Sequence, residues 1–271
     1  MLPAVVPRLL SLTESHRAGV SDITEIISSD PALTSNILKV ANSAYYGFSQ
    51  HIDDLDRAVA LLGFQMVKSL ALSLGVMKNV RSSVRHEHYS HDGLWIHCLA
   101  VASAMQAMAA VHGAGRDNAH LFVAGLLHDI GKMVLDQFFP DLFEQALGLV
   151  NQQQGMQLYQ AERRVIGYDH GEVAGILLTR WRFPEQIISP VRFHHNDHPD
   201  DNVSQQDIAM LHIADAMVQQ VGLGESGNPK PPEIMENDLQ NIGITPDELD
   251  QMLHHVEASK EKIYAFFGAV G

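Results

Sequence analysis

The stretch VAGLLHDIGKMVL, from Val123 to Leu135, sets two polar residues, His128 and Asp129, side by side in an apolar run. Along most of the chain, apolar residues recur every three or four positions, which is the spacing of a buried face on an α-helix. No alternating, β-branched run between turn residues predicts a convincing strand. The sequence therefore predicts an all-α fold with the His-Asp pair inside it.

Capping residues indicate where several helices begin. Asp30, Asp169, Ser204 and Thr245 each precede a helical pattern and can accept hydrogen bonds from its first turn. The polar, His-rich stretch Arg81–Gly93 is expected to be a connector between two helical layers. Helices are expected over residues 31–46, 55–78 with an interruption near Gly63, 94–112, 118–139, 170–183, 205–221 and 246–266, with a further one beginning at Pro184.

Composition limits the classes of function. The chain has 271 residues, of which 46% are hydrophobic, so it can bury the core of one large domain or two small ones. Its formal charge of −14 disfavours binding to nucleic acids and to anionic membranes. A single cysteine, Cys98, cannot form an internal disulfide, so we expect a reducing compartment, the cytoplasm. We expect no targeting segment, and the long apolar stretch 94–113 suits a buried helix better than a membrane span.

Several polar residues fall on faces that should be buried. Asp215 shares a helix face with apolar residues, where an unpaired carboxylate would cost several kcal/mol. His97 and His128 also lie on packed faces. The candidate metal ligands are His97, His128, Asp129, His170, His194, His195 and Asp215. This set could hold two divalent ions that share Asp129; because it has no thiolate, it favours iron or manganese, with zinc as an alternative.

Each candidate also has a simpler explanation. A single histidine on an apolar face, such as His97 or His170, is more often a hydrogen-bonded core residue than a ligand. Asp215 has a nearby partner in His212, three residues earlier on the same helix. The histidine pair at 194–195 could simply end a helix, where an imidazolium suits the helix dipole. The metal hypothesis therefore depends on the number of such residues.

The sequence resembles the HDOD family, the HD-related output domains of bacterial signalling proteins, within the HD phosphohydrolase superfamily. The resemblance spans nearly the whole chain. It is carried by the segments LPAVVPRLLSL, SDPALTSNILKVANSAYYGF, DLDRAVALLGFQMVKSLAL, LWIHCLAVA, AGLLHDIGKMVL, DHGEVAGILLTRWRFPEQI, VRFHH and LHIADAM.

The resemblance implies an N-terminal helical bundle packed on an HD-like helical core. We expect residues 1–85 to form the first, 86–223 the second, and 224–271 a loop and helix packed on the HD-like domain. The superfamily's signature residues correspond to His97, His128, Asp129 and Asp215. The additional histidines of the related HD-GYP phosphodiesterases match His170, His194 and His195, and Lys132 stands where such enzymes carry a lysine near the substrate phosphate.

One part of the HD-GYP pattern is missing. Those enzymes follow their paired histidines with an acidic residue and a Gly-Tyr-Pro segment, whereas this chain reads HHNDHPDDNV. The strongest reason to expect cleavage of a cyclic dinucleotide is therefore absent. Glu87 is only a loose positional candidate for an upstream glutamate ligand.

Two functions follow as hypotheses. The first, which the sequence favours, is a signalling output or adaptor domain that binds a partner of the histidine kinase or diguanylate cyclase type through its N-terminal helices. The second is a metal-dependent phosphohydrolase acting on a nucleotide, a cyclic dinucleotide or another phosphorylated small molecule. In that enzyme Asp129 would orient a water molecule and Lys132 would neutralise charge on the phosphoryl oxygens.

Overall fold

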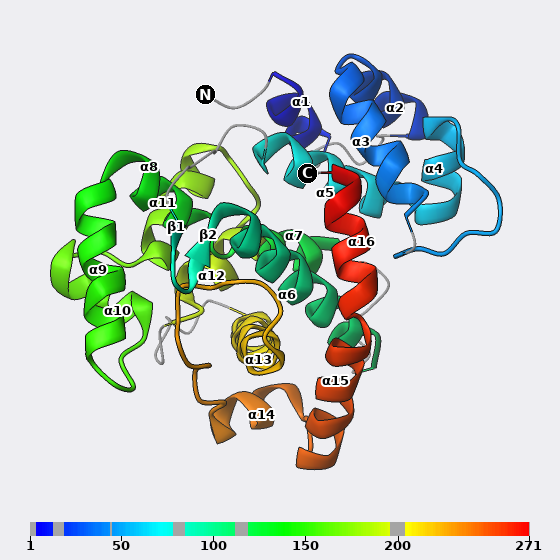
Figure 1. Cartoon of the computed structure of the whole chain (residues 1–271). Coiled ribbons are helices and arrows are strands. Elements are labelled where there is room, and N and C mark those ends of the chain that lie inside the picture. Colours follow the sequence, from blue (N-terminus) through cyan, green and yellow to red (C-terminus); the bar gives the residue numbers. More distant parts are fainter. Residues whose placement is uncertain are drawn as a thin grey trace. The chain divides into compact units, whose positions relative to one another are not determined.

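The chain divides into two compact units, one formed by residues 1–80 with 261–271 and the other by residues 81–260 (Figure 1). The computed structural model describes residues 4–12, 19–43, 45–77, 85–111, 119–195 and 204–270. Apart from one short hairpin, the regular structure of these residues is α-helical, which confirms the predicted all-α fold. The domain division into residues 1–85, 86–223 and 224–271 stays a prediction.

The first unit is a set of short helices. They are α1 (Val5–Ser11), α2 (Val20–Ser28), α3 (Pro31–Ala41), α4 (Leu55–Leu62), α5 (Phe64–Met77) and nearly all of α16 (Lys260–Val270). Asp30 caps α3 as predicted, because its Oδ1 accepts hydrogen bonds from the backbone N–H of Ala32 and Leu33, both at 3.0 Å. The predicted interruption at Gly63 is confirmed, since this residue separates α4 from α5 with a φ of 89°.

The helix that starts at Pro31 is shorter than predicted, ending at Ala41 instead of near Gly47. Asn42 explains the difference. Its Oδ1 accepts a hydrogen bond from the backbone N–H of Ile52 at 2.8 Å, and its Nδ2 donates one to the Ile52 carbonyl at 2.7 Å. These bonds tie the end of the helix to a distant loop, so the chain leaves the helical path there.

The second unit holds the remaining elements. They are β1 (Arg85–His86), β2 (Tyr89–Ser90), α6 (His91–Val111), α7 (Ala119–Leu127), α8 (Ile130–Phe138), α9 (Pro140–Gln152), α10 (Leu158–Val165), α11 (His170–Arg180), α12 (Glu185–Phe193), α13 (Gln205–Val221), α14 (Glu236–Ile242) and α15 (Pro246–Ala258). The strands form an antiparallel hairpin inside the predicted connector, and α6 begins directly after β2. Helices α9, α10 and α14 were not predicted, and the predicted helix 246–266 is broken at Ser259.

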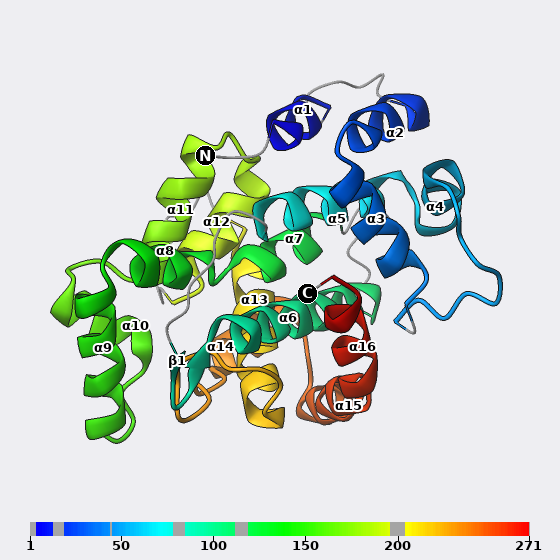
Figure 2. The same cartoon turned by 45° about the horizontal axis from the view of Figure 1, so that its top comes forward.

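Helix α6 packs against α7 and α13 and is buried over most of its length (Figure 2). By length and composition it could cross a membrane, as could α4 and α5 if they formed one span bent by 116°. However, 67% of the apolar window of α6 is buried inside the protein. Such burial is typical of a core helix, as the sequence predicted.

The helix predicted over residues 118–139 is instead two helices, broken at the His128-Asp129 pair. At Asp129 the backbone leaves the helical region, with φ −97° and ψ 7°. A Cβ on Gly131 would lie 1.9 Å from the carbonyl oxygen of His170, so only glycine lets α8 pack this closely against the start of α11. The break therefore brings the His-Asp pair next to the first residue of α11.

Three N-caps that the sequence predicted in the second unit are confirmed. The side chains of Asp169, Ser204 and Thr245 each accept a hydrogen bond from the backbone N–H three residues further on, at 2.8, 3.3 and 3.3 Å. They fix where α11, α13 and α15 begin. The first of these caps is the one that matters for the site, because His170 follows Asp169 directly.

Candidate metal centre

The seven candidate ligands lie together in the second unit. They come from the middle of α6 (His97), the α7–α8 break (His128, Asp129), the start of α11 (His170), the end of α12 (His194, His195) and the middle of α13 (Asp215). Six of them are at most 3% exposed, and His195 is half-buried. Helices far apart in the sequence thus converge on one buried polar centre; the role of these residues as metal ligands stays a prediction.

The first cluster is formed by His97, His128 and Asp129, whose ligand atoms all lie within 4.8 Å of one another. Asp215 belongs to the same group. Its Oδ1 is 2.9 Å from Nε2 of His97 and 3.9 Å from Nε2 of His128. Two imidazoles and two carboxylates therefore surround one small volume.

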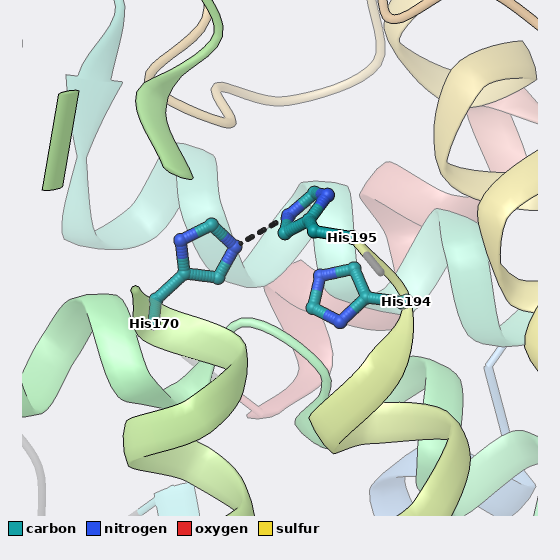
Figure 3. Close-up of side chains that lie close together, drawn as sticks. All are labelled: His170, His194 and His195. Carbon is teal, nitrogen blue, oxygen red and sulfur yellow. Dashed lines mark hydrogen bonds between the residues drawn. The ribbon is translucent and has the colours of Figure 1, made fainter. Parts of the chain in front are cut away.

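The second cluster consists of His170, His194 and His195, again within 4.8 Å (Figure 3). The rings of His170 and His195 point toward each other, with their Nε2 atoms 2.8 Å apart. Two Nε2 atoms this close need either a shared proton or a common cation between them. Among the described residues, these two clusters are the groups that could hold a metal ion.

Asp129 connects the two clusters through its two carboxylate oxygens. Its Oδ2 lies 3.3 Å from Nε2 of His128 and 3.7 Å from Nε2 of His97. Its Oδ1 faces the other way and lies 3.2 Å from Nε2 of His170. One carboxylate therefore reaches both clusters.

Buried atoms without hydrogen-bond partners show that the centre fits cations. Within the described residues, Nε2 of His128 and of His194 has no such partner, and Nε2 of His97 and Oδ1 of Asp129 contact only other members of the centre. In two of these histidines the other ring nitrogen is held by a backbone carbonyl: Nδ1 of His128 by Gly125 and Nδ1 of His194 by Val191, both at 2.7 Å. These contacts favour the tautomer whose Nε2 lone pair faces the centre, as in metal sites.

Helix α10 supports the second cluster, and this support was not predicted from the sequence. Glu162 is fully buried, and its Oε2 accepts hydrogen bonds from the backbone N–H of His170 at 2.9 Å and from its Nδ1 at 2.6 Å. The ring of Tyr159 stacks on that of His195, with centroids 4.4 Å apart and planes 9° apart. Arg163 forms an ion pair of 2.6 Å with Asp169, the cap of α11. No sequence motif links α10 to α11. The only sequence signal for Glu162 is that an acidic residue stands eight positions before the candidate ligand His170.

Lys132 provides a positive charge inside the centre. It is 2% exposed, and its Nζ donates hydrogen bonds to Oδ2 of Asp129 at 2.6 Å and to the carbonyl of Ser226 at 2.8 Å. Burial alone would lower the pKa of Lys132, but the carboxylates of Asp129 and Asp215 raise it above its usual value. The lysine therefore stays protonated and neutralises Asp129.

The imidazoles of the second cluster differ in charge. Burial, reinforced by neighbouring histidines, lowers the pKa of His194 and of His195 well below the usual value. Burial also opposes the charged form of His170, but the Glu162 carboxylate outweighs it and raises the pKa of His170 to about 9. Two neutral imidazoles are thus ready to bind a cation without first losing a proton.

The alternative partner of Asp215 is excluded by the structure. His212 does not pair with Asp215: its Nδ1 lies 2.6 Å from Oδ2 of Asp238 on α14. The two carboxylate oxygens of Asp215 instead accept hydrogen bonds from Nε2 of Gln219, at 2.8 and 2.9 Å. Asp215 thus faces His97 on one side and a neutral amide on the other.

Two cavities reach the centre. One, of about 360 Å³, is lined by His194 and His195 of the second cluster together with residues of α13 and α14. The other, of about 250 Å³, is lined by His97 of the first cluster and by the loop that follows α13. Glu87, the loose positional candidate for a further ligand, is exposed and lines the second cavity. The cavities therefore border on one histidine of the first cluster and on two of the second.

The fold is shared with solved structures of signalling and hydrolase-like proteins. A protein from Marinobacter aquaeolei VT8, proposed to act in signal transduction, has a TM-score of 0.86 at 20% identity, over 100% of this chain and 59% of that one. A proposed phosphohydrolase from Shewanella amazonensis SB2B has a TM-score of 0.78 at 21% identity, over 100% of this chain and 94% of that one. At these identities the likeness establishes the fold.

Sequence comparison establishes the family. The model of the HDOD domain matches residues 1–197, and the chain belongs to the HDOD family. An uncharacterized protein of Treponema pallidum (strain Nichols) is 26% identical over 195 residues, which are 72% of this chain and 37% of that protein. The chain thus spans well under half the length of this relative and 59% of the Marinobacter protein.

Proposed function

We propose that this HDOD protein is a divalent-metal-dependent phosphohydrolase. The proposal is carried by one observation: a buried set of five imidazoles and two carboxylates that borders on two cavities large enough for small molecules. Structural metal sites are closed by their ligands, whereas catalytic sites keep a position open. An accessible centre therefore supports chemistry on a bound molecule more than it supports a purely structural ion.

The ligands divide between two ions. His97, His128 and Asp215 would hold one, the three histidines of the second cluster would hold the other, and Asp129 would touch both. Imidazole and carboxylate donors without a thiolate favour iron or manganese, with zinc as an alternative. Divalent ions in such a centre supply Lewis acidity, which activates water and polarises phosphoryl oxygens.

Lys132 and Asp129 act beside the ions. The Nζ of Lys132 is a buried, protonated donor that can neutralise charge growing on a phosphoryl oxygen. The Asp129 carboxylate can accept a hydrogen bond from the attacking water and so fix its direction. The low exposure of both side chains keeps bulk water away, which strengthens these interactions.

The test is metal analysis followed by an activity screen. Protein purified without chelator should contain about two divalent ions per chain and should hydrolyse at least one phosphoester among nucleotides, cyclic dinucleotides and bis(4-nitrophenyl) phosphate. The double variant His128→Ala/Asp129→Ala should contain little metal and show no activity. Metal-loaded protein that is inert toward the whole panel would contradict the proposal.

The second candidate function is that of an output or adaptor domain, and one observation favours it. None of the seven candidate ligands lies in the first unit, so these helices can serve another purpose. The first unit also exposes apolar side chains: Val20 on α2, Phe48 in the segment between α3 and α4, and Leu61 on α4 are 45%, 38% and 46% exposed. A partner of the histidine kinase or diguanylate cyclase type would bind there, in the cytoplasm.

The adaptor function has a test that is independent of the metal. Purified partners of these two classes should bind the full chain, and Leu61→Asp should weaken the binding. Glu144→Gln, an exchange at an exposed position of the other unit, should leave the binding intact. Equal binding by the wild type and Leu61→Asp would count against this surface.

A further inference from the structure

The cavity beside His194 and His195 has a chemical character that limits what it can bind. It measures about 360 Å³ and lies between the second cluster, α13, α14 and the loop Lys230–Glu233. Its size is near the lower end of the roughly 300–1,000 Å³ that small-molecule sites occupy. All of its lining residues belong to the second unit.

The charges around this cavity fit one phosphate group. Lys230 is its sole lysine, and no arginine lines it, within the part of the chain that the structure describes. Two carboxylates also line it: Glu233, which would repel additional negative charge, and Asp238, which is paired with His212. Sites for polyanions usually carry several basic side chains, above all arginine. A triphosphate or a ligand with two separate phosphates would therefore lack counter-charges here.

The uncharged part of the wall fits a flat body with hydrogen-bonding edges. Gln157, Gln205, Asn237 and Asn241 offer amide groups, each of which both donates and accepts hydrogen bonds. Nε2 of Gln157 already donates to the Lys230 carbonyl at 3.3 Å, which ties the two sides of the rim together. Apolar contact is available from side chains such as Met235. This mixture suits a nucleobase better than a sugar chain or a fatty acid.

We infer that this cavity binds a compact phosphate monoester, of the size of a single nucleoside monophosphate, with its phosphate toward His194 and His195. The inference rests on the proposed phosphohydrolase function and names its substrate class. A cyclic dinucleotide contains two separate phosphates, for which the single lysine of the cavity offers too little positive charge. Hydrolysis breaks the P–O bond to the ester oxygen. The oxygen of water goes to phosphorus and one of its protons to the released alcohol, which gives a nucleoside and inorganic phosphate.

Binding is measured by calorimetry on manganese-loaded protein. The probes are phosphonate analogues of adenosine and guanosine 5′-monophosphate, the free nucleosides, the nucleoside triphosphates and a cyclic dinucleotide. We expect the phosphonates to bind at least tenfold more tightly than every other probe. Equal or tighter binding of the cyclic dinucleotide would overturn the inference.

Two variants locate the binding in the cavity. Lys230→Gln removes the single lysine and should weaken phosphonate binding about tenfold while leaving nucleoside binding and metal content unchanged. Asn237→Leu should weaken binding of phosphonates and nucleosides alike. The matched control is Lys39→Gln, the same exchange at an exposed position in the other unit, which should have no effect. Unchanged phosphonate affinity in Lys230→Gln would overturn the assignment.

Hydrolysis, measured in parallel, separates this inference from the proposed function. Monophosphates are followed by release of inorganic phosphate, bis(4-nitrophenyl) phosphate by release of 4-nitrophenol, and the cyclic dinucleotide by chromatography of the linear product. If bis(4-nitrophenyl) phosphate or a cyclic dinucleotide is hydrolysed while monophosphates are neither bound nor hydrolysed, the substrate class is wrong and the phosphohydrolase function stands. If the phosphonates bind and respond to Lys230→Gln but no ester is hydrolysed, the cavity assignment stands and the phosphohydrolase function fails.

Discussion

A single carboxylate oxygen of Glu162 accepts two hydrogen bonds from His170, one from the backbone N–H at 2.9 Å and one from ring Nδ1 at 2.6 Å. This double contact fixes both the start of α11 and the orientation of its first imidazole. The other ring nitrogen, Nε2, is thereby directed toward Asp129 and His195. The geometry of the second cluster thus depends on a residue of α10 that is not among the seven candidate ligands.

Replacing this residue should weaken metal binding at the second cluster. In Glu162→Gln, the amide is a poorer acceptor for two donors, so His170 loses its fixed orientation. Loss of such a supporting contact typically costs about 10- to 100-fold in metal affinity. Elemental analysis should show the metal content falling from two ions toward one per chain.

The control for this variant is Glu144→Gln, the same exchange at an exposed position on α9. It should leave the metal content unchanged. If Glu162→Gln retains full occupancy with unaltered affinity, Glu162 supports the fold and does not tune the second cluster.

Removing the shared carboxylate should abolish binding at both clusters and destabilise the protein. Asp129→Asn leaves the ammonium of Lys132 buried without its counter-charge, and breaking a buried pair in this way costs about 3–5 kcal/mol. Thermal denaturation measures the loss of stability, and elemental analysis measures the loss of metal.

A second exchange separates these two effects. In the double variant Asp129→Asn/Lys132→Met the unpaired charge is gone, so much of the stability should return while the metal remains absent. A double variant as unstable as Asp129→Asn alone would show that the cost does not come from the unpaired lysine.

Chelation should lower the melting temperature of metal-loaded protein. An ion that binds only the native state stabilises it by about 2.7 kcal/mol when its free concentration is 100 times the dissociation constant. For a chain of this size that corresponds to a shift on the order of 5–10 °C. Addition of manganese after removal of the chelator should restore the original value, and a melting curve that does not respond to either step would argue against metal occupancy.

Gly131 should tolerate no side chain. A Cβ there would lie 1.9 Å from the His170 carbonyl oxygen, so Gly131→Ala must push α8 away from α11 and widen the space around Asp129. We expect a lower melting temperature together with weaker metal binding. Gly148→Ala on α9 is the matched control, because a Cβ there meets nothing within 4 Å and alanine favours the helix by up to about 1 kcal/mol.

Much of the fold followed from sequence because its signals are local. Apolar spacing and the caps at Asp30, Asp169, Ser204 and Thr245 depend on neighbouring residues alone, and these caps formed as predicted. The break at Asp129 was not predicted because it depends on a contact between residues that are far apart in the sequence. The close packing at Gly131 against the His170 backbone stabilises two short helices where the apolar pattern alone favours one.

The candidate site, too, was predictable only in the part that depends on local sequence signals. The seven candidates could be found by asking which polar residues on apolar helix faces and at helix ends needed partners, and the structure brings all seven together. Glu162 and Tyr159 could not be found this way, because their roles depend on how α10 packs beside the ends of α11 and α12. The sequence favoured an adaptor over an enzyme because of its HDOD-type N-terminal helices and the missing Gly-Tyr-Pro segment. The proposal of a phosphohydrolase instead takes its support from the two cavities at the centre.

Lys132 gives the centre an internal counter-ion. Since its ammonium group balances Asp129, this buried carboxylate has a counter-charge supplied by the chain itself. The same group donates to the Ser226 carbonyl, in the loop that lines the cavity beside His97. One side chain therefore connects the carboxylate shared by the two clusters to the loop that lines this cavity.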